Sequence, residues 1–416
     1  MKLKPSPFAP DTFPELPVVD GIEAITASRG FYAASGLDRD DVFLFSFPPN
    51  TVCAGVFTQS STASADVQWC REALASGLGQ ARALVVNSGN SNAFTGPKGK
   101  EKNDHTLRAM VDALNVPIDQ CFLAATGVIG EPLPDPNYVG SVVPDMAARL
   151  GPPDWEACAR AFMTTDTYPK GAFATCEIDG QTVSLSGIAK GSGMIAPNMA
   201  TMLAYVFTDA AISQPVLDAL LKAAVKTSFN AITVDSDTST SDTLMVFATG
   251  QSDAPIISTM DDPRASAFAK ALNQVCRDLA IQIVKDGEGA SKFITITVEG
   301  APDDDIAHHL CADIANSPLM KTALAAGDAN WGRVIMALGK SGLPIDQTAL
   351  KIWFGDTLVA EQGARAESYD EATASAECAK SEITIRVQVG EGAGQATVYT
   401  CDLTHAYIDI NGAYRT

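Results

Sequence analysis

The chain has 416 residues, 46% of them hydrophobic and 19% charged, which is enough apolar material for one or more large cores. A formal net charge of −20 opposes binding to nucleic acid or to an anionic membrane surface. No segment approaches the roughly 18 apolar residues of a membrane span, and the proline-rich N-terminal segment lacks the apolar stretch of a secretory signal. Nine scattered cysteines without a CxxC pair are typical of reduced thiols in the cytoplasm.

Helices and strands are expected to alternate along the chain without the regular period of βαβ units. Helices are expected at 66–78, at 103–114 with Asn103 as cap, at 214–226 with Ser213 as cap, and at 263–285. Strands are expected at 82–87, 121–125, 172–178, 182–188, 202–207, 232–234, 244–248 and 293–298. The pair Asp179-Gly180 predicts a hairpin between 172–178 and 182–188.

A third region begins near residue 345 and has strand-like runs at 350–354, 382–389 and 397–402. Mixed strands with amphipathic helices on their outer faces predict an α+β layered sandwich, with the third region as a smaller unit.

The segment from Gly187 to Asp209 carries the strongest chemical signal. A Gly/Ser-rich turn leads to Thr201, which opens an apolar run long enough for one buried strand. A self-cleaving enzyme with an N-terminal nucleophile requires this arrangement. The Thr201 hydroxyl attacks the carbonyl of Ala200, the bond between the two residues breaks, and the freed α-amino group acts as base for its own hydroxyl. A glycine turn before an ordinary core strand is the simpler alternative, and this segment alone leaves both open.

Three further positions carry residue types suited to acyl transfer. Thr126-Gly127 follows an expected strand, where backbone N–H groups can stabilise an oxyanion, although the pair also fits an ordinary β-turn. Lys190, before the glycine turn, suits a substrate carboxylate. Glu288, between two glycines, suits a substrate ammonium group. Solvated loop side chains are the alternative for both charged residues.

No metal site and no catalytic histidine are expected. His308, His309 and Cys311 lack metal-ligand spacing. The acidic run 235–242 lacks the glycine and terminal glutamate of an EF-hand, so hydrogen bonding within the loop is the expected role of Asp235, Asp237 and Asp242. None of the four histidines lies in a glycine-rich or strand-end motif, which favours a nucleophile that carries its own base.

Eight sequence blocks match blocks of one known family and follow one another in the same order as in that family. They are NSGNSNAFTG (87–96), ATGVIGEPL (125–133), TTDTYPK (164–170), the 187–209 segment, SFNAITVDSDTSTSDT (228–243), VKDGEGASKFITITVEGA (284–301), DANWGR (328–333) and NGAYRT (411–416). Together they resemble the ornithine acetyltransferase (bifunctional glutamate N-acetyltransferase) family of arginine biosynthesis. The family usually has Ala where Ser91 stands, often Cys at Phe94, and Asn at Ser241. These departures affect pocket shape rather than the chemical residues.

The resemblance implies an α/β/β/α sandwich around the nucleophile, with a smaller C-terminal domain. Self-cleavage between Ala200 and Thr201 would give an alpha chain of residues 1–200 and a beta chain of residues 201–416. It also implies an oxyanion hole at Thr126 and Gly127. The implied substrate-binding residues are Thr164, Lys190, Thr201, Glu288, Asn411 and Thr416. The apolar tract 407–410 is expected to hold the C-terminus in place as a strand.

The implied reaction moves the acetyl group of N2-acetylornithine to Thr201 and then to glutamate, which yields ornithine and N-acetylglutamate. This cycle needs no cofactor; some family members also accept acetyl-CoA as donor, and the sequence does not decide that point. The family implies a cytoplasmic heterotetramer of two alpha and two beta chains with small-molecule substrates. Two alternatives stay open: a related amidase or aminopeptidase, in which water takes the acyl group, and a catalytically silent binding protein.

Overall fold

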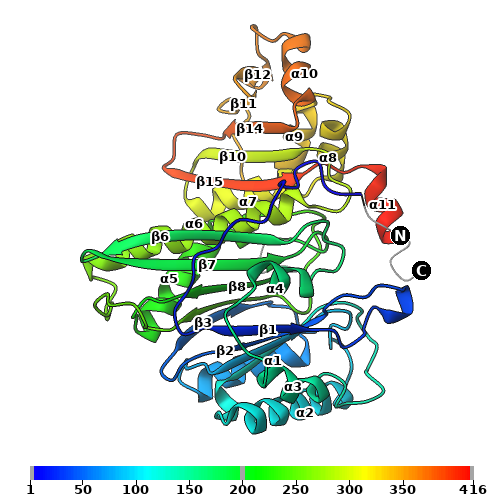
Figure 1. Ribbon diagram of the computed structural model, residues 1–416. Helices are drawn as coiled ribbons and strands as arrows, with labels where there is room; N and C mark the ends of the chain where they lie inside the picture. Colours follow the sequence, from blue (N-terminus) through cyan, green and yellow to red (C-terminus); the bar gives the residue numbers. More distant parts are fainter. Residues whose placement is uncertain (1–3, 197–201, 413–416) are drawn as a thin grey trace.

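The computed structural model describes residues 4–196 and 202–412, which contain three β-sheets. Two sheets are stacked in a larger body, and the third belongs to a smaller body made by the C-terminal part of the chain (Figure 1). The expectation of a mixed α and β protein is confirmed at this level.

The first sheet forms one layer of the larger body. Its strands run in the order β1 (Glu23–Ala27), β2 (Val42–Ser46), β4 (Ala83–Asn87) and β5 (Cys121–Ala125). The first two pairings are antiparallel, and β4 and β5 are parallel. The carboxyl ends of β4 and β5 therefore lie at the same edge of the sheet, next to Thr126.

The second sheet forms the neighbouring layer. Its strands run in the order β3 (Val52–Phe57), β9 (Thr243–Ala248), β8 (Leu203–Thr208), β7 (Gln181–Lys190) and β6 (Lys170–Ile178). Strands β8 and β9 are parallel, and the other pairs are antiparallel. The turn between β6 and β7 has positive φ at Asp179 (50°) and Gly180 (79°), as the predicted hairpin requires.

A core of aromatic rings joins the two sheets. Alternate residues of each strand point to opposite faces, so Phe45 of β2 and Phe207 of β8 meet between the sheets. Their ring centroids lie 4.6 Å apart in a stacked pair, and those of Phe47 and Phe247 lie 4.5 Å apart. Each such pair contributes about 0.5–1.5 kcal/mol beyond its buried area. Both faces of these strands are buried, which explains their continuous apolar runs.

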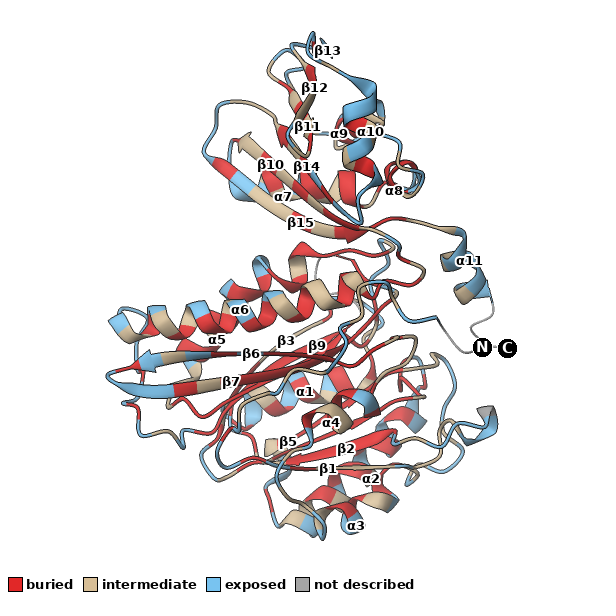
Figure 2. Ribbon diagram, turned by 45° about the horizontal axis from the view of Figure 1, so that its top comes forward, coloured by how far each residue is buried: buried red, intermediate tan, exposed pale blue. Residues whose placement is uncertain are grey.

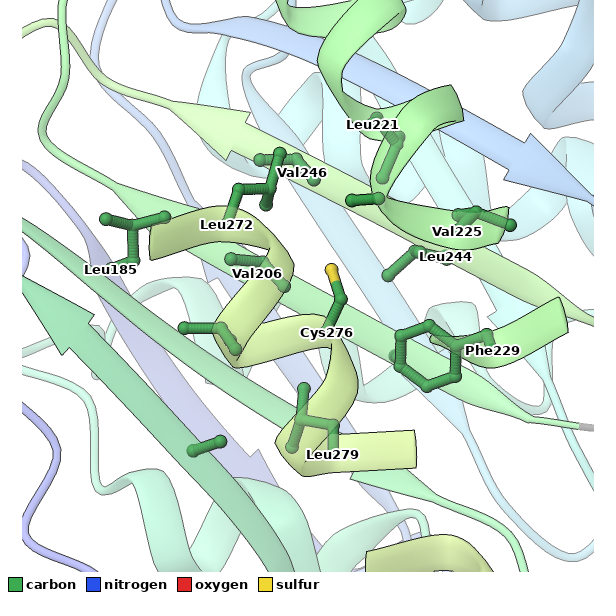
Figure 3. Packing of buried hydrophobic residues seen from close by; sticks show 14 of the residues in the cluster. Leu185, Val206, Leu221, Val225, Phe229, Leu244, Val246, Leu272, Cys276 and Leu279 are labelled. Carbon is green, nitrogen blue, oxygen red and sulfur yellow. The ribbon is translucent and has the colours of Figure 1, made fainter. Parts of the chain in front are cut away.

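Helices cover the outer faces of the stacked sheets. Helices α5 (Gln214–Lys226) and α6 (Pro263–Lys285) cover the second sheet, where Leu272 and Cys276 point toward Val206 and Val246 (Figure 3). Helices α2 (Pro97–Leu114) and α3 (Val143–Ala147) cover the first sheet. Two helices contribute side chains to the core between the sheets: α1 (Ala65–Ser76) and α4 (Trp155–Ala161). Buried residues accordingly concentrate on the strands and on the inner faces of the helices (Figure 2).

The smaller body has its own core and six strands. In sheet order they are β13 (Ala364–Arg365), β12 (Thr357–Glu361), β11 (Lys351–Phe354), β14 (Glu382–Gln388), β10 (Phe293–Ala301) and β15 (Gly394–Cys401). Its helices are α7 (Asp304–Ala315), α8 (Pro318–Ala325), α9 (Trp331–Gly339) and α10 (Glu371–Ala379). The core includes Ile294 and Ile296 of β10 packed with Ile314 of α7. This body therefore begins at β10 rather than near residue 345.

Several local expectations are wrong for identifiable reasons. Asn103 does not cap a helix: α2 begins at Pro97, and Asn103 is buried within it and accepts a hydrogen bond from Asn92. Ser213 is the N-cap residue of α5, as expected, but its hydroxyl donates to the carbonyl of Ser258 and makes no capping hydrogen bond. The segment 232–234 is buried but pairs with β15 only through a single bridge, from Ile232 to Tyr399, which is too little pairing to make it a strand.

Within the part of the chain that the structure describes, no helix is both long and apolar enough to cross a membrane.

The aromatic core predicts a large stability difference between two phenylalanines of the second sheet. Phe207→Ala removes a fully buried ring and should lower the free energy of unfolding by about 3–5 kcal/mol. Phe173→Ala, on β6, removes a ring that is 44% exposed and should change it by less than about 0.5 kcal/mol. Urea titration followed by tryptophan fluorescence measures both. Equal effects of the two substitutions would contradict the placement of the core.

Candidate active site

A cavity of about 240 Å³ opens where the ends of β5, β7 and β9 meet the loops around Thr164 and Glu288. Six of the residues predicted from sequence line it: Thr126, Gly127, Thr164, Lys190, Glu288 and Asn411. Three other predicted residues, Ala200, Thr201 and Thr416, lie outside the described residues. Met202, the residue after Thr201, lines the cavity.

Lys190 is the last residue of β7 and points between the two sheets. It lies on the same face of β7 as Ile188, whose side chain belongs to the core between the sheets. Its ammonium group donates to the Thr164 hydroxyl at 2.9 Å and to the Thr126 hydroxyl at 3.2 Å. Lys190 is therefore a buried side chain rather than a solvated loop lysine. Burial lowers its pKa, and the carboxylate of Asp166 opposes that effect.

Thr126 and Gly127 follow β5, at the edge shared with β4. The Thr126 amide donates to the carbonyl of Asn87 at 3.0 Å, so it is already used by the backbone. Because a lysine ammonium only donates, the Thr126 hydroxyl accepts from Lys190 and keeps its own proton for another acceptor. Two hydrogen-bond donors therefore remain for a ligand here, the Thr126 hydroxyl and the Gly127 amide, rather than two backbone amides.

Gly127 is required by both backbone conformation and space. Its φ is +131°, and a Cβ atom there would lie 2.4 Å from the carbonyl carbon of Gly89. Only glycine allows this close approach of two backbone segments.

Glu288 and Asn411 also line the cavity. The Glu288 carboxylate accepts a hydrogen bond from the Asn411 side-chain amide at 2.6 Å, and the Glu288 amide donates to the Ser192 carbonyl at 2.8 Å. Burial raises the pKa of Glu288, and hydrogen bonds from Thr165 and Asn411 oppose the change. A positively charged substrate group would therefore find a partly desolvated acceptor here.

Asn411 comes from a helix, not from the strand expected over 407–410. Helix α11 (His405–Gly412) begins after Thr404, whose side chain accepts a hydrogen bond from the Ala406 amide at 3.2 Å. The Tyr407 hydroxyl donates to Asp235 at 3.1 Å and fixes the helix against the larger body. A four-residue apolar tract is too short to distinguish a helix from a strand by periodicity.

Asp242 and Asp166 are the buried carboxylates of this region that the sequence did not single out for the site. Asp242 lines the cavity, and its Oδ1 atom accepts from the Met202 amide at 2.9 Å. Among the described residues its buried Oδ2 atom has no hydrogen-bond partner, and burial raises its pKa. The parallel pairing of β8 with β9 places Asp242 beside Met202, so correct strand pairing would have found it.

Other sequence candidates lie elsewhere or act locally. The Asp235 carboxylate accepts from the amides of Met194 (2.6 Å) and Ile195 (2.8 Å) in the glycine-rich turn, and from the Asp237 amide (3.3 Å) within its own loop. None of the four histidines lines the cavity. Of the three departures from the family pattern, Ser91 and Ser241 line the cavity, and Phe94 is 80% exposed.

Known proteins share this sequence over most of its length. The sequence model of the ArgJ family matches residues 28–416. The chain belongs to the ArgJ family. It is 51% identical to the arginine biosynthesis bifunctional protein ArgJ of Rhizobium meliloti over 99% of both chains, and 49% identical to that of Agrobacterium fabrum over the full length of both. A crystal structure of the Bacillus halodurans ArgJ protein is 40% identical with a TM-score of 0.50, covering 51% of this chain and 100% of that one.

The close approach of Gly193 to Glu288 allows a test of whether Glu288 contacts the substrate in the ArgJ cavity. A Cβ atom on Gly193 would lie 2.4–2.6 Å from the carboxylate atoms of Glu288. Because that group ends a flexible side chain, Gly193→Ala should move the carboxylate and leave the fold intact. We expect KM for acetylornithine to rise about tenfold or more, equivalent to about 1.4 kcal/mol of lost binding. Steady-state kinetics measure it.

Gly151→Ala is the matched control, because a Cβ atom there meets nothing within 4 Å. It should leave KM unchanged. An unchanged KM in Gly193→Ala as well would show that Glu288 does not contact the substrate.

Proposed function

We propose that this cavity is the active site in which Thr201 carries an acetyl group from N2-acetylornithine to glutamate. As a member of the ArgJ family, the chain is a bifunctional acyltransferase of arginine biosynthesis, an ornithine acetyltransferase and glutamate N-acetyltransferase. One observation carries the assignment of residues: a buried ammonium group, an oxyanion-type donor pair and a buried carboxylate all face one cavity beside Met202.

The first half-reaction would acetylate Thr201. Its hydroxyl attacks the acetyl carbonyl while its α-amino group takes the hydroxyl proton. The Thr126 hydroxyl and the Gly127 amide donate to the tetrahedral oxyanion, an arrangement in which one donor typically contributes about 10²–10³ in rate. Collapse of the intermediate breaks the bond between the acetyl carbon and the α-nitrogen of ornithine. Ornithine leaves after its α-nitrogen takes the proton held by the α-amino group of Thr201. An acetyl ester on Thr201 remains.

The second half-reaction would reverse these steps with glutamate. Its α-amino group attacks the ester carbonyl, N-acetylglutamate leaves, and the Thr201 hydroxyl regains its proton. Both substrates carry an α-carboxylate, which suits the ammonium group of Lys190, whereas Glu288 suits the ammonium group of ornithine. A single cavity therefore serves both half-reactions. No cofactor takes part in this cycle, and acetyl-CoA is a second donor to be tested separately.

Self-cleavage after Ala200 fits the topology of the second sheet, which we propose is the sheet that carries the nucleophile in an α/β/β/α sandwich. Strands β3, β6 and β7 would belong to the chain of residues 1–200, and β8 and β9 to the chain of residues 201–416. Because β8 and β9 lie between β3 and β7, backbone hydrogen bonds would hold the two chains together after cleavage.

A solved relative supports two separate chains. The crystallised Bacillus halodurans chain spans 51% of this chain and matches over its whole length. We extend the proposal to a heterotetramer with two copies of each chain. The nine cysteines are all unpaired, which supports a reducing, cytoplasmic location.

The acetyl acceptor decides between transfer and hydrolysis. With acetylornithine alone, a transferase should release about one equivalent of ornithine per site and then stop; added glutamate should restore turnover. An amidase would release ornithine continuously without glutamate, and a silent binding protein would release none. Chromatographic assay of ornithine separates these outcomes.

Thr201→Ala should abolish both processing and transfer, because it removes the hydroxyl that attacks in each reaction. The wild type should run as two chains on a denaturing gel, and the variant as one chain of 43.5 kDa. Thr201→Ser is the control, because it keeps a hydroxyl and should still be cleaved. An active wild-type enzyme found only as the uncleaved chain would overturn the proposal.

Initial-rate plots at several fixed glutamate concentrations should give parallel lines, as a ping-pong reaction requires.

Lys190→Ala should lower kcat/KM for both substrates by about 10²-fold or more, since one buried charge serves both carboxylates. Lys222→Ala, at a lysine whose side chain is 62% exposed, should have no effect. Intersecting lines, or a Lys190 variant impaired toward one substrate only, would indicate two separate sites.

A further inference from the structure

A buried charge cluster lies behind the cavity and contains two carboxylates and one ammonium group. The Lys170 ammonium lies 2.7 Å from Asp166 and 2.6 Å from Asp286, and all three side chains are 0% exposed. Lys170 begins β6, and Asp286 is the C-cap residue that follows α6. The cluster holds one negative charge more than its single cation neutralises. A buried excess charge is costly unless another cation is near.

Hydrogen bonds connect this cluster to the lysine side of the cavity. Asp166 accepts from the Thr164 amide at 3.0 Å through Oδ2, and from the Gly191 amide at 2.6 Å through Oδ1. Thr164 is a partner of the Lys190 ammonium, and Gly191 is the residue after Lys190. Asp166 thus fixes the backbone on both sides of the Lys190 side chain.

The cluster also reaches the carboxylate side of the cavity. Asp286 accepts from the Thr167 amide at 2.8 Å and lies two residues before Glu288 in the chain. The same buried group of charges therefore connects the segments that carry Thr164, Lys190 and Glu288.

The charge of Asp166 acts directly on Lys190. Burial disfavours the charged form of Lys190, and Asp166 gives the largest opposing interaction. For Asp166, burial is outweighed by the charges of Lys170 and Lys190, which hold its pKa well below the ordinary value. The next largest charge interactions with Lys190 come from Lys170, which disfavours its protonation, and from Glu288 and Asp242, which favour it.

We propose that Asp166 is a positioning residue for substrate binding: it holds Thr164 and Gly191 in place, and its negative charge keeps the Lys190 ammonium protonated for the substrate carboxylate. The inference rests on the role proposed above for Lys190. A deprotonated Lys190 amine would lose its attraction for a substrate carboxylate. The extra negative charge of the cluster therefore keeps Lys190 in the protonated form that binds the substrate.

The test compares two substitutions in the same cluster. Asp166→Asn and Asp286→Asn each remove one carboxylate, and each leaves Lys170 with one carboxylate partner. Neither variant therefore leaves an unpaired buried ammonium group. Of these two carboxylates, Asp166 has the larger effect on Lys190, because it gives the largest of the charge interactions that favour the protonated form. The two variants are thus matched in chemistry and in burial, and they differ in their effect on Lys190.

The measurement is the pH dependence of kcat/KM for acetylornithine. Removing the Asp166 charge makes protonated Lys190 less stable, so activity at alkaline pH should be lost at a lower pH. We expect the alkaline limb to move down by about one pH unit or more in Asp166→Asn. It should stay at the wild-type position in Asp286→Asn. The substrate amine titrates equally with every variant, so a difference between variants belongs to the protein.

Asp166→Glu keeps the charge and is the conservative variant; its alkaline limb should stay at the wild-type position. A uniform loss of activity at all pH values in Asp166→Asn, or the same shift in Asp286→Asn or Asp166→Glu, would overturn the proposal. If Asp166→Asn does not fold, a downward shift in Asp166→Glu alone also overturns it. The Lys190→Ala kinetics are a separate arm: full activity there would refute the role of Lys190 itself.

Discussion

The antiparallel pairing of β7 with β8 is the interaction on which the site depends. It places Lys190, at the end of β7, opposite Leu203, at the start of β8. The parallel pairing of β8 with β9 then brings Asp242 beside Met202. A shift of one residue in either register would turn these side chains to the opposite face of the sheet. The aromatic core between the sheets opposes such a shift, because the same alternation buries Phe207 and Phe247.

Burial of charge explains why the cavity suits zwitterionic substrates. The chain is strongly acidic overall, yet the cavity is lined by both a buried ammonium group, that of Lys190, and a buried carboxylate, that of Glu288. Water competes poorly inside such a site, so each charge interacts more strongly with a bound ligand than it would at the surface. Hydrogen bonds with Thr126, Thr164 and Asn411 satisfy these two groups within the protein.

Patterns within single segments of the sequence predicted most helices and strands. They predicted fewer of the contacts between residues of the site. Long amphipathic runs gave α5 and α6 with their observed bounds, and β5 also matched, because each pattern extends over a whole element. The layers and the early start of the smaller body depend on strand pairing between distant segments. The family resemblance added Thr164 and Asn411 to four residues whose types already suited acyl transfer, whereas Asp166 and Asp242 stood in loops whose burial only the folded chain reveals. The helix that carries Asn411 was missed because its apolar tract is short.

The central claim is that Thr201 carries the acetyl group between the two substrates. The most direct measurement is intact-protein and peptide mass spectrometry of the wild-type enzyme mixed with acetylornithine in the absence of glutamate. The account predicts one added acetyl group on the chain of residues 201–416, located at Thr201, and its removal when glutamate is added. An acetyl group on another residue, or turnover with no acetylated protein at any time after mixing, would contradict it.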